Sequence, residues 1–303
     1  MRILLQFPEG LKQQALGHAK RLESEGNEVF VSASPTFGAC DLALDEARSL
    51  HTDKLVHFGH CEFQKVDFNF EYVEYPIDAP LVVLRDSLKH LKGFKTLCLL
   101  TTIQHVHQLV EIKSFYESEG KTVVYNKPNG FAKNPGQLLG CDAGNVAVLD
   151  GSVDAFVYFG GGIFHPLGAL LQTTKPFFCV DPFQKRVERI DSMRETYKKK
   201  SKGRVVASLG AKNFAVLLST KNGQCNMELA KMLKKQIEEA GLTAVVLVSN
   251  TFDFGSINNF MEFDAFVNTA CPRISIDDGD RLRKPLLSAS ELATVLELRS
   301  IKK

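Results

Sequence analysis

The segment Val153-Asp154-Ala155-Phe156-Val157-Tyr158-Phe159-Gly160-Gly161 has two counterparts elsewhere in the chain. They are Thr52-Asp53-Lys54-Leu55-Val56-His57-Phe58-Gly59-His60 and Phe263-Asp264-Ala265-Phe266-Val267-Asn268-Thr269-Ala270-Cys271, and all three align without gaps. In each, an aspartate precedes an apolar run that ends in small or polar residues. Such a run is typical of a buried strand in a parallel sheet. We therefore predict one α/β unit repeated three times.

Three further elements precede this strand in every repeat. A first strand is predicted at 3–7, 97–101 and 214–219, and an amphipathic helix follows it. Each helix pattern ends at a glycine, which supplies the left-handed residue that stops a helix. The glycines are Gly26, Gly120 and Gly241. A second strand is predicted at 29–32, 122–125 and 244–248.

We therefore expect an α/β fold of three similar small domains with parallel sheets, arranged around a pseudo-threefold centre. The expected boundaries are 1–93, 94–203 and 204–303. The second domain is expected to end in a charged linker that forms a helix over 187–200.

Two cysteines occupy the same place in the first two repeats. Cys40 and Cys141 each lie 13 positions before the repeated aspartate. The third repeat has Thr251 at this place and carries Cys271 at the carboxyl end of its last strand, level with His60. Ligands bind outside the carboxyl ends of parallel strands. Three thiolates converging there would form a metal or iron–sulfur site with one open ligand position.

The other four cysteines indicate different roles. Cys98 and Cys179 lie inside apolar strands, where a cysteine is usually a small core residue. Cys61 follows a strand end, where we expect a structural role, and Cys225 lies in a loop before a helix. Seven scattered cysteines do not resemble a secreted disulfide framework, so reduced thiols in the cytosol are expected.

The composition is that of a globular cytoplasmic enzyme. The chain has 303 residues, of which 44% are hydrophobic and 24% charged, and a formal net charge of +2. This charge gives no reason to expect nucleic-acid binding. No apolar run is long enough to span a membrane, and residues 1–8 indicate a first strand rather than a signal peptide.

The stretch Cys271-Pro272-Arg273-Ile274-Ser275-Ile276-Asp277 resembles the Cys-Pro-Arg-(Leu/Ile)-Ser-Ile-Asp signature of the diphthamide-synthesis enzymes. These are the 2-(3-amino-3-carboxypropyl)histidine synthases. Further segments resemble the family in order along nearly the whole chain, the third-domain loop in its archaeal form. They are Gln6-Phe7-Pro8-Glu9-Gly10-Leu11, Phe37-Gly38-Ala39-Cys40-Asp41, His57-Phe58-Gly59-His60-Cys61, Asp181-Pro182-Phe183 and Leu218-Ser219-Thr220-Lys221-Asn222-Gly223-Gln224.

The resemblance implies a non-conventional radical S-adenosylmethionine enzyme. Cys40, Cys141 and Cys271 match the cysteines that hold the family's [4Fe-4S] cluster, whose fourth iron is free for S-adenosylmethionine. In that family, cleavage of S-adenosylmethionine gives a 3-amino-3-carboxypropyl radical, which adds to the imidazole C2 of one histidine on translation elongation factor two, and the resemblance implies the same reaction here. No catalytic residue beyond the cluster ligands is implied.

Four residues at strand ends are expected to line the cofactor pocket. His60 and Gly161 lie level with the third cysteine, and Gly59 and Gly160 precede them. Bare glycine backbone allows close approach of a bulky ligand. The alternative is that the glycines only form turns and that His60 is a structural histidine.

Three more residues are expected to contact the cofactor. Arg273 could pair with the carboxylate of S-adenosylmethionine, or instead with Asp277. Glu9 and Gln224 follow the first strands of their repeats and could reach the same cleft. Glu9 could instead be a first-turn helix residue, and Gln224 a polar loop residue.

The expected partner is the elongation factor, and a homodimer without nucleic-acid or membrane contacts is expected. The electron donor is not identified by the sequence. Two alternatives stay open. One is a quinolinate synthase-like enzyme, which also has three domains, three cysteines and an open cluster. The other is a non-enzymatic scaffold or small-molecule-binding protein with structural cysteines.

Overall fold

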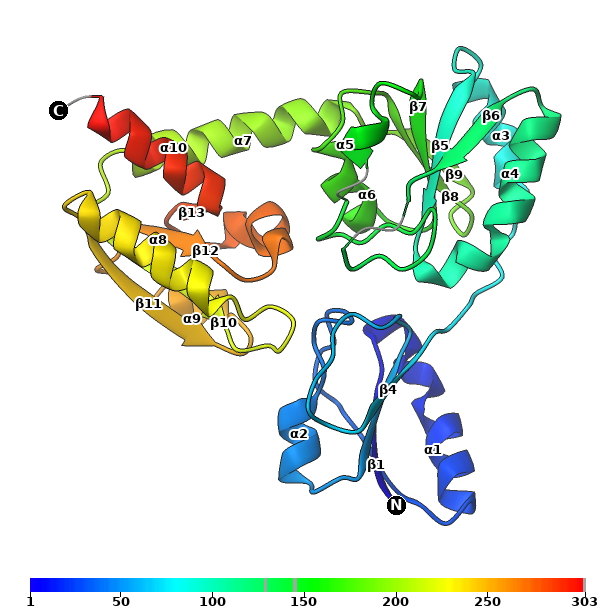
Figure 1. Ribbon diagram of the computed structural model, residues 1–303, viewed down its shortest axis with the longest axis horizontal. Coiled ribbons are helices and arrows are strands. Elements are labelled where there is room, and N and C mark those ends of the chain that lie inside the picture. Colours follow the sequence, from blue (N-terminus) through cyan, green and yellow to red (C-terminus); the bar gives the residue numbers. More distant parts are fainter. Residues whose placement is uncertain (128–129, 144–145, 302–303) are drawn as a thin grey trace. The chain divides into compact units, whose positions relative to one another are not determined.

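The computed structural model describes residues 1–127, 130–143 and 146–301. The chain divides into two compact units, Met1–Ser192 and Met193–Lys303. The first unit contains two β-sheets and the second unit contains one (Figure 1).

The first sheet of the first unit has four parallel strands in the order β2-β1-β3-β4. Helix α1 packs against one face and α2 against the other, so both faces are buried. The elements are β1 (Arg2–Gln6), the 3-10 helix η1 (Glu9–Gln14), α1 (Ala15–Ser24), β2 (Glu28–Val31), α2 (Leu44–Ser49), β3 (Lys54–Phe58) and β4 (Phe70–Val73).

The second sheet repeats this order as β6-β5-β7-β8 and adds an antiparallel edge strand, β9. Helices α3 and α4 cover one face. The elements are α3 (Val83–His90), β5 (Thr96–Thr101), η2 (Ile103–Gln108), α4 (Leu109–Ser118), β6 (Thr122–Tyr125), α5 (Val146–Leu149), β7 (Ala155–Phe159), α6 (Phe164–Leu170), β8 (Phe177–Asp181) and β9 (Arg186–Arg189).

The sheet of the second unit has the same parallel order, β11-β10-β12-β13. Helices α8 and α10 pack on one face and α9 on the other. The elements are α7 (Ser192–Ser208), β10 (Asn213–Ser219), α8 (Met227–Glu239), β11 (Thr243–Ser249), α9 (Phe254–Ile257), β12 (Ala265–Asn268), the π-helical turn η3 (Ile274–Asp278), η4 (Gly279–Arg281), β13 (Leu286–Leu287) and α10 (Ala289–Ser300).

These three sheets confirm the predicted repeat and explain its aspartate. The Asp154 carboxylate accepts the backbone N–H groups of Lys95 and Thr96, both at 2.8 Å. Asp264 accepts two N–H groups in the same way, and Asp53 accepts one. The aspartate before each third strand therefore binds the chain where the first strand begins, which sets the register of the two strands.

The three glycines predicted to end the helices are also confirmed. Gly26, Gly120 and Gly241 have φ angles of 84°, 76° and 78°. This left-handed conformation is easily reached only by glycine. The similar helix ends thus reflect one backbone geometry used three times.

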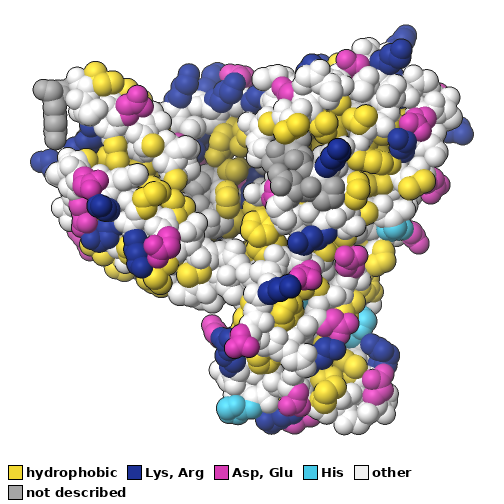
Figure 2. Space-filling view, viewed as in Figure 1, with side chains coloured by type: hydrophobic (Ala, Val, Ile, Leu, Met, Phe, Trp, Pro, Cys, Tyr) yellow, Lys and Arg dark blue, Asp and Glu magenta, His cyan; other side chains and the backbone are white. Residues whose placement is uncertain are grey.

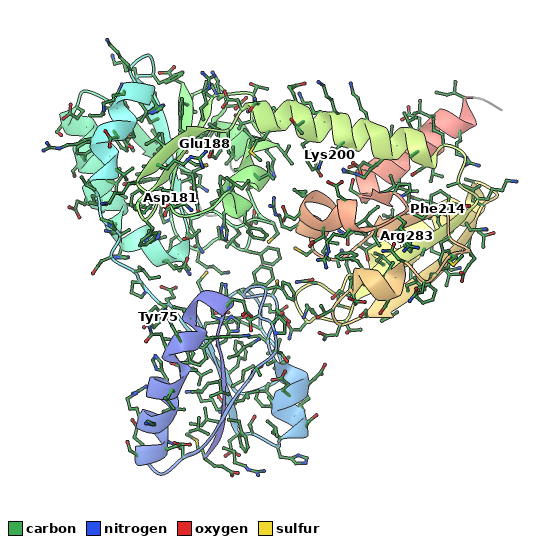
Figure 3. All side chains as sticks on the ribbon, turned by 180° about the vertical axis from the view of Figure 1, so that it is seen from behind. Tyr75, Asp181, Glu188, Lys200, Phe214 and Arg283 are labelled. Atoms are coloured by element: carbon green, nitrogen blue, oxygen red, sulfur yellow. The ribbon has the colours of Figure 1, made fainter. Side chains whose placement is uncertain are left out.

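The predicted linker helix over 187–200 is wrong at both ends. Residues 186–189 form β9, in which Val187 packs on the core while Arg186 and Glu188 form an ion pair. Glu188 lies opposite β8, which ends at Asp181 (Figure 3). The helix α7 begins only at Ser192. It continues to Ser208, because Val205 is buried in the core of the second unit.

The distribution of charged side chains on the surface is consistent with the small formal net charge. Figure 2 shows positively and negatively charged side chains interspersed over the face in view. Within the described part of the chain, no helix combines the length and the apolar character needed to cross a membrane.

Candidate functional site

Cys40 lies in the loop between β2 and α2, and its side chain is partly exposed. The buried Gln6, at the end of β1, binds the residues that follow Cys40. Its Nε2 donates to the carbonyl oxygen of Asp41 at 2.6 Å, and its Oε1 accepts the N–H of Ala43 at 3.0 Å. The Tyr72 hydroxyl donates to the carbonyl oxygen of Ala39 at 2.7 Å. Side chains from two strands therefore hold the loop on both sides of the cysteine.

His57 and His60 extend this network. Nδ1 of His57 lies 2.8 Å from Oε1 of Gln6, and because Oε1 only accepts, Nδ1 must carry the proton. Burial lowers the pKa of His57 well below its ordinary value and that of His60 to about 4. Both rings are therefore neutral near pH 7. Nε2 of His57 then accepts from Nδ1 of His60 at 2.8 Å.

Cys141 lies in the loop between β6 and α5 and is exposed. Its neighbour Asp142 accepts the N–H of Phe131 at 2.7 Å. The base of the loop pairs with β5, because Leu138 donates to the carbonyl oxygen of Thr101 at 2.8 Å. The loop is thus anchored to the sheet immediately before the cysteine.

Cys271 belongs to the second unit and follows β12. Asn268, the last residue of β12, donates to the carbonyl oxygen of Cys271 at 2.9 Å and to Oγ of Ser275 at 3.1 Å, while its own oxygen accepts the N–H of Ala270 at 3.0 Å. Burial raises the pKa of the Cys271 thiol, and a backbone hydrogen bond and the charge of Arg273 oppose this shift.

Arg273 is 4% exposed, and its Nη2 lies 2.6 Å from Oδ1 of Asp277. Of the two roles expected for Arg273, the ion pair with Asp277 is therefore present. Burial raises the pKa of Asp277, and the guanidinium opposes this shift. A role toward a cofactor carboxylate stays a prediction.

Gly59 and Gly160 are needed for backbone reasons. Gly59 has φ +81°, and a Cβ there would lie 2.9 Å from Cδ1 of Leu11. Gly160 has φ +150°, and a Cβ there would lie 2.8 Å from the hydroxyl of Tyr158. Gly161 is exposed, and a Cβ there would make only an ordinary contact. Gly59 and Gly160 therefore have the expected turn role, which does not depend on contact with a ligand.

Glu9 and Gln224 lie after the first strands of their repeats, as expected. Glu9 begins η1, is exposed and pairs with Lys12 at 2.7 Å. Gln224 lies partly exposed in the turn before α8, where its N–H donates to the carbonyl oxygen of Lys221 at 2.9 Å. Glu9 is therefore a first-turn residue and Gln224 a loop residue, which are the two alternatives expected for them.

The remaining cysteines divide into core and surface. Cys98 and Cys179 are buried within strands, where burial raises the pKa of both thiols to about 12, so their predicted core role is confirmed. Cys225 is exposed. Cys61 is buried and lies at 3.1 Å from Nε2 of Gln137, a residue of the second repeat that the sequence interpretation did not single out.

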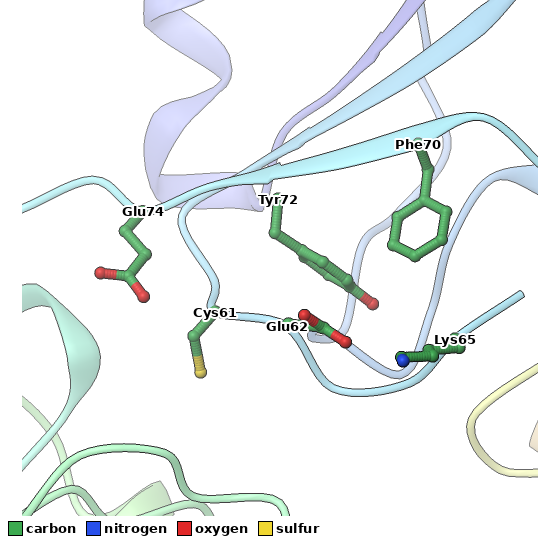
Figure 4. A pocket seen from close by; sticks show the side chains of 6 residues that line it. All are labelled: Cys61, Glu62, Lys65, Phe70, Tyr72 and Glu74. Carbon is green, nitrogen blue, oxygen red and sulfur yellow. The ribbon is translucent and has the colours of Figure 1, made fainter.

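A cavity of about 410 Å³ opens beside the Cys40 loop (Figure 4). Tyr72 lines it and also binds the residue before Cys40, so the cavity and the loop share a wall. Its lining combines aromatic rings, carboxylates, one amine and one thiol: Cys61, Glu62, Lys65, Phe70, Tyr72 and Glu74. Phe70, Glu71 and Tyr72 alternate between aromatic and charged residues, a pattern that could have indicated the strand behind this wall.

The candidate cluster ligands are distributed over both units. Cys40 and Cys141 lie in the first unit and Cys271 in the second. Among the residues that the structure describes, no three or more histidine, cysteine or acidic side chains are grouped as a metal site. A cluster shared by the three cysteines stays a prediction.

Comparison with known proteins supplies the family. The model of the diphthamide synthesis protein family matches residues 7–303. The 2-(3-amino-3-carboxypropyl)histidine synthase of Pyrococcus horikoshii is 35% identical over 302 residues, 98% of this chain and 86% of that protein. The human protein named subunit 1 of this synthase is 30% identical over 303 residues, 97% of this chain and 68% of that protein.

A solved structure agrees with the sequence matches. The crystal structure of Dph2 from Pyrococcus horikoshii with a 4Fe-4S cluster superposes with a TM-score of 0.89 and 34% identity, covering 98% of this chain and 86% of that one. The same fold therefore extends over nearly the whole chain, which confirms the predicted α/β architecture. With its three sheets of one strand order and its family match from residue 7 to residue 303, the chain belongs to the diphthamide synthesis protein family.

Proposed function

We propose that this chain transfers a 3-amino-3-carboxypropyl group from S-adenosylmethionine to the imidazole C2 of a histidine on translation elongation factor two. This would be the first step of diphthamide formation. The proposal is supported by relatives named for the same product, one of them 35% identical. The family assignment also replaces the quinolinate synthase alternative.

The observation that carries the proposal is the placement of three thiols. Cys40, Cys141 and Cys271 each follow a parallel strand and are partly or fully exposed, whereas Cys98 and Cys179 are enclosed in strands. Three accessible cysteines can donate three thiolates to a [4Fe-4S] cluster and leave its fourth iron open. The donor set therefore fits the cluster present in the related Dph2 structure.

When bound, the cluster would supply the electron that cleaves the bond between the sulfonium sulfur and the γ-carbon of S-adenosylmethionine. The chain's own residues would position the ligands. Gln6 and Asn268 hold the backbone beside Cys40 and Cys271. Holding one cluster requires that Cys271, from the second unit, reach the other two cysteines.

The remaining proposals follow the sequence. Three domains with boundaries at 1–93, 94–203 and 204–303, arranged around a pseudo-threefold centre, would each provide one cysteine. The archaeal-like loop favours a homodimer in the cytoplasm. His60, Gly161, Arg273, Glu9 and Gln224 are proposed to face the cofactor, together with Gly59 and Gly160.

One experiment tests this function directly. The anaerobically reconstituted protein is incubated with S-adenosylmethionine, dithionite and the elongation factor. We expect methylthioadenosine and a mass gain on the factor, both lost in Cys40→Ala, Cys141→Ala and Cys271→Ala. The Cys179→Ala variant serves as the control. Full activity in any of the three ligand variants would refute the cluster assignment, and a colourless, inactive wild type would support the scaffold alternative.

A further inference from the structure

The residues that follow β3 contact the second repeat at Gly59, Cys61 and Phe63. The Gln104 amide donates to the carbonyl oxygen of Gly59 at 2.7 Å. The two aromatic rings of Phe63 and Phe131 stack with centroids 3.9 Å apart. We call these contacts, with the central pair Cys61 and Gln137, the seam.

The central contact of the seam has only one possible orientation. Gln137 is fully buried, and its Oε1 accepts the N–H groups of Lys133 at 2.9 Å and Asn134 at 3.0 Å. Its Nε2 must therefore be the atom that faces Cys61, at 3.1 Å. Burial raises the pKa of the Cys61 thiol, so a neutral sulfur accepts this hydrogen bond.

Each partner is linked to one candidate ligand loop. Gln137 lies four residues before Cys141, at the base of its loop, where its neighbour Leu138 binds β5. Cys61 follows His60, from which hydrogen bonds lead through His57 and Gln6 to the Cys40 loop. The N–H···S contact thus connects the two loops without using either candidate ligand.

We propose that Cys61 and Gln137 are a positioning pair that sets the placement of the Cys141 loop relative to the Cys40 loop, so that two of the three cluster ligands are prearranged in the first unit. Cys61 is then an acceptor and not a fourth ligand. The inference rests on the proposed function in its reference to a cluster. It goes beyond that function because it assigns a role to Cys61, a cysteine that is not needed as a cluster ligand.

The test compares substitutions that keep or remove the acceptor. Cys61→Ser keeps an acceptor of similar size, whereas Cys61→Ala and Gln137→Leu each break the contact. After anaerobic reconstitution, iron per chain and the rate of iron loss to a chelator are measured. We expect about tenfold faster loss in Cys61→Ala and in Gln137→Leu, no further acceleration in the double variant, and near wild-type behaviour in Cys61→Ser.

Three outcomes would overturn the proposal. If Cys61→Ser fails to bind iron, as expected for Cys40→Ala, Cys61 is a ligand. If the double variant multiplies the two single effects, the residues act independently through packing. If Cys61→Ala loses iron at the same rate as the buried-thiol control Cys179→Ala, the contact between Cys61 and Gln137 has no positioning role.

A second measurement needs no cluster. Hydrogen exchange at the N–H of Leu138, which binds Thr101, reports on the base of the Cys141 loop in the iron-free chain. We expect faster exchange in Gln137→Leu and Cys61→Ala, restored in Cys61→Ser. Unchanged exchange in both disrupting variants would refute the seam. A wild type that binds no iron but shows this exchange pattern would refute the proposed function alone.

Discussion

Asn268 donates from its side-chain amide to the carbonyl oxygen of Cys271 across 2.9 Å, at the point where β12 ends. The same place in the first repeat, four residues after the aspartate, is His57, and in the second repeat it is Tyr158. All three side chains are buried, at 7%, 0% and 1% exposure. Each third strand therefore carries a buried polar residue at its last or next-to-last position, and in two repeats this residue belongs to a network that holds a cysteine loop.

Replacing Asn268 by alanine should loosen Cys271. The substitution removes two donated hydrogen bonds and leaves the N–H of Ala270 without this acceptor, so we expect a loss of about 1–3 kcal/mol in the free energy of unfolding. Urea denaturation and iron content measure the two effects. The exposed Asn259→Ala should change neither, and a stable Asn268→Ala variant with full iron content would contradict this role.

The repeated aspartates should act on stability through the backbone. Asp154→Ala removes the acceptor of two N–H groups, so we expect a loss of about 1 kcal/mol in the free energy of unfolding. Asp154→Asn keeps an oxygen acceptor and should lose less. Denaturation in urea at pH 7 compares the two variants, and an equal loss in both would show that the carboxylate charge, rather than the acceptor geometry, is what matters.

Much of the fold could be predicted because the repeat signals are local. The aspartate, the apolar strand and the glycine stop are each read from a few consecutive residues, and the structure repeats their order in three sheets. The fourth strands of the first and third sheets were missed, because β13 has two residues and β4 forms only where it pairs with β3. The predicted linker helix was misplaced because Val187, as part of a strand, packs against a core that also contains residues far away in the sequence.

The site was predictable in its cysteines but not in their supports. Register within the repeats identified Cys40 and Cys141, and the Cys-Pro-Arg segment identified Cys271. Gln6 and Gln137 gave no such signal, because a buried glutamine and an exposed one look alike in a single sequence. Their roles depend on hydrogen bonds to residues 35 and 76 positions away.

The ion pair between Arg273 and Asp277 should affect the free energy of unfolding most when only one partner is removed. Asp277→Ala leaves the guanidinium, 4% exposed, without this carboxylate, so we expect a loss of about 3 kcal/mol in the free energy of unfolding. The double variant Arg273→Met/Asp277→Ala should recover part of it, since no buried charge is left. Urea denaturation of the single and double variants measures the coupling, and additive losses would refute it.

The histidine pair should make the chain sensitive to acid. His60 has its pKa lowered from 6.5 to about 4 by burial, so between these values the unfolded chain binds a proton that the folded chain does not. The free energy of unfolding should therefore fall as the pH is lowered from about 6.5 to 4, by on the order of 3 kcal/mol. His60→Gln, which can still donate to His57, should flatten this dependence, whereas the exposed His90→Gln should not. Urea denaturation of the iron-free protein across this range measures the slope, and an identical slope in wild type and His60→Gln would show that His60 is already protonated or accessible in the folded state.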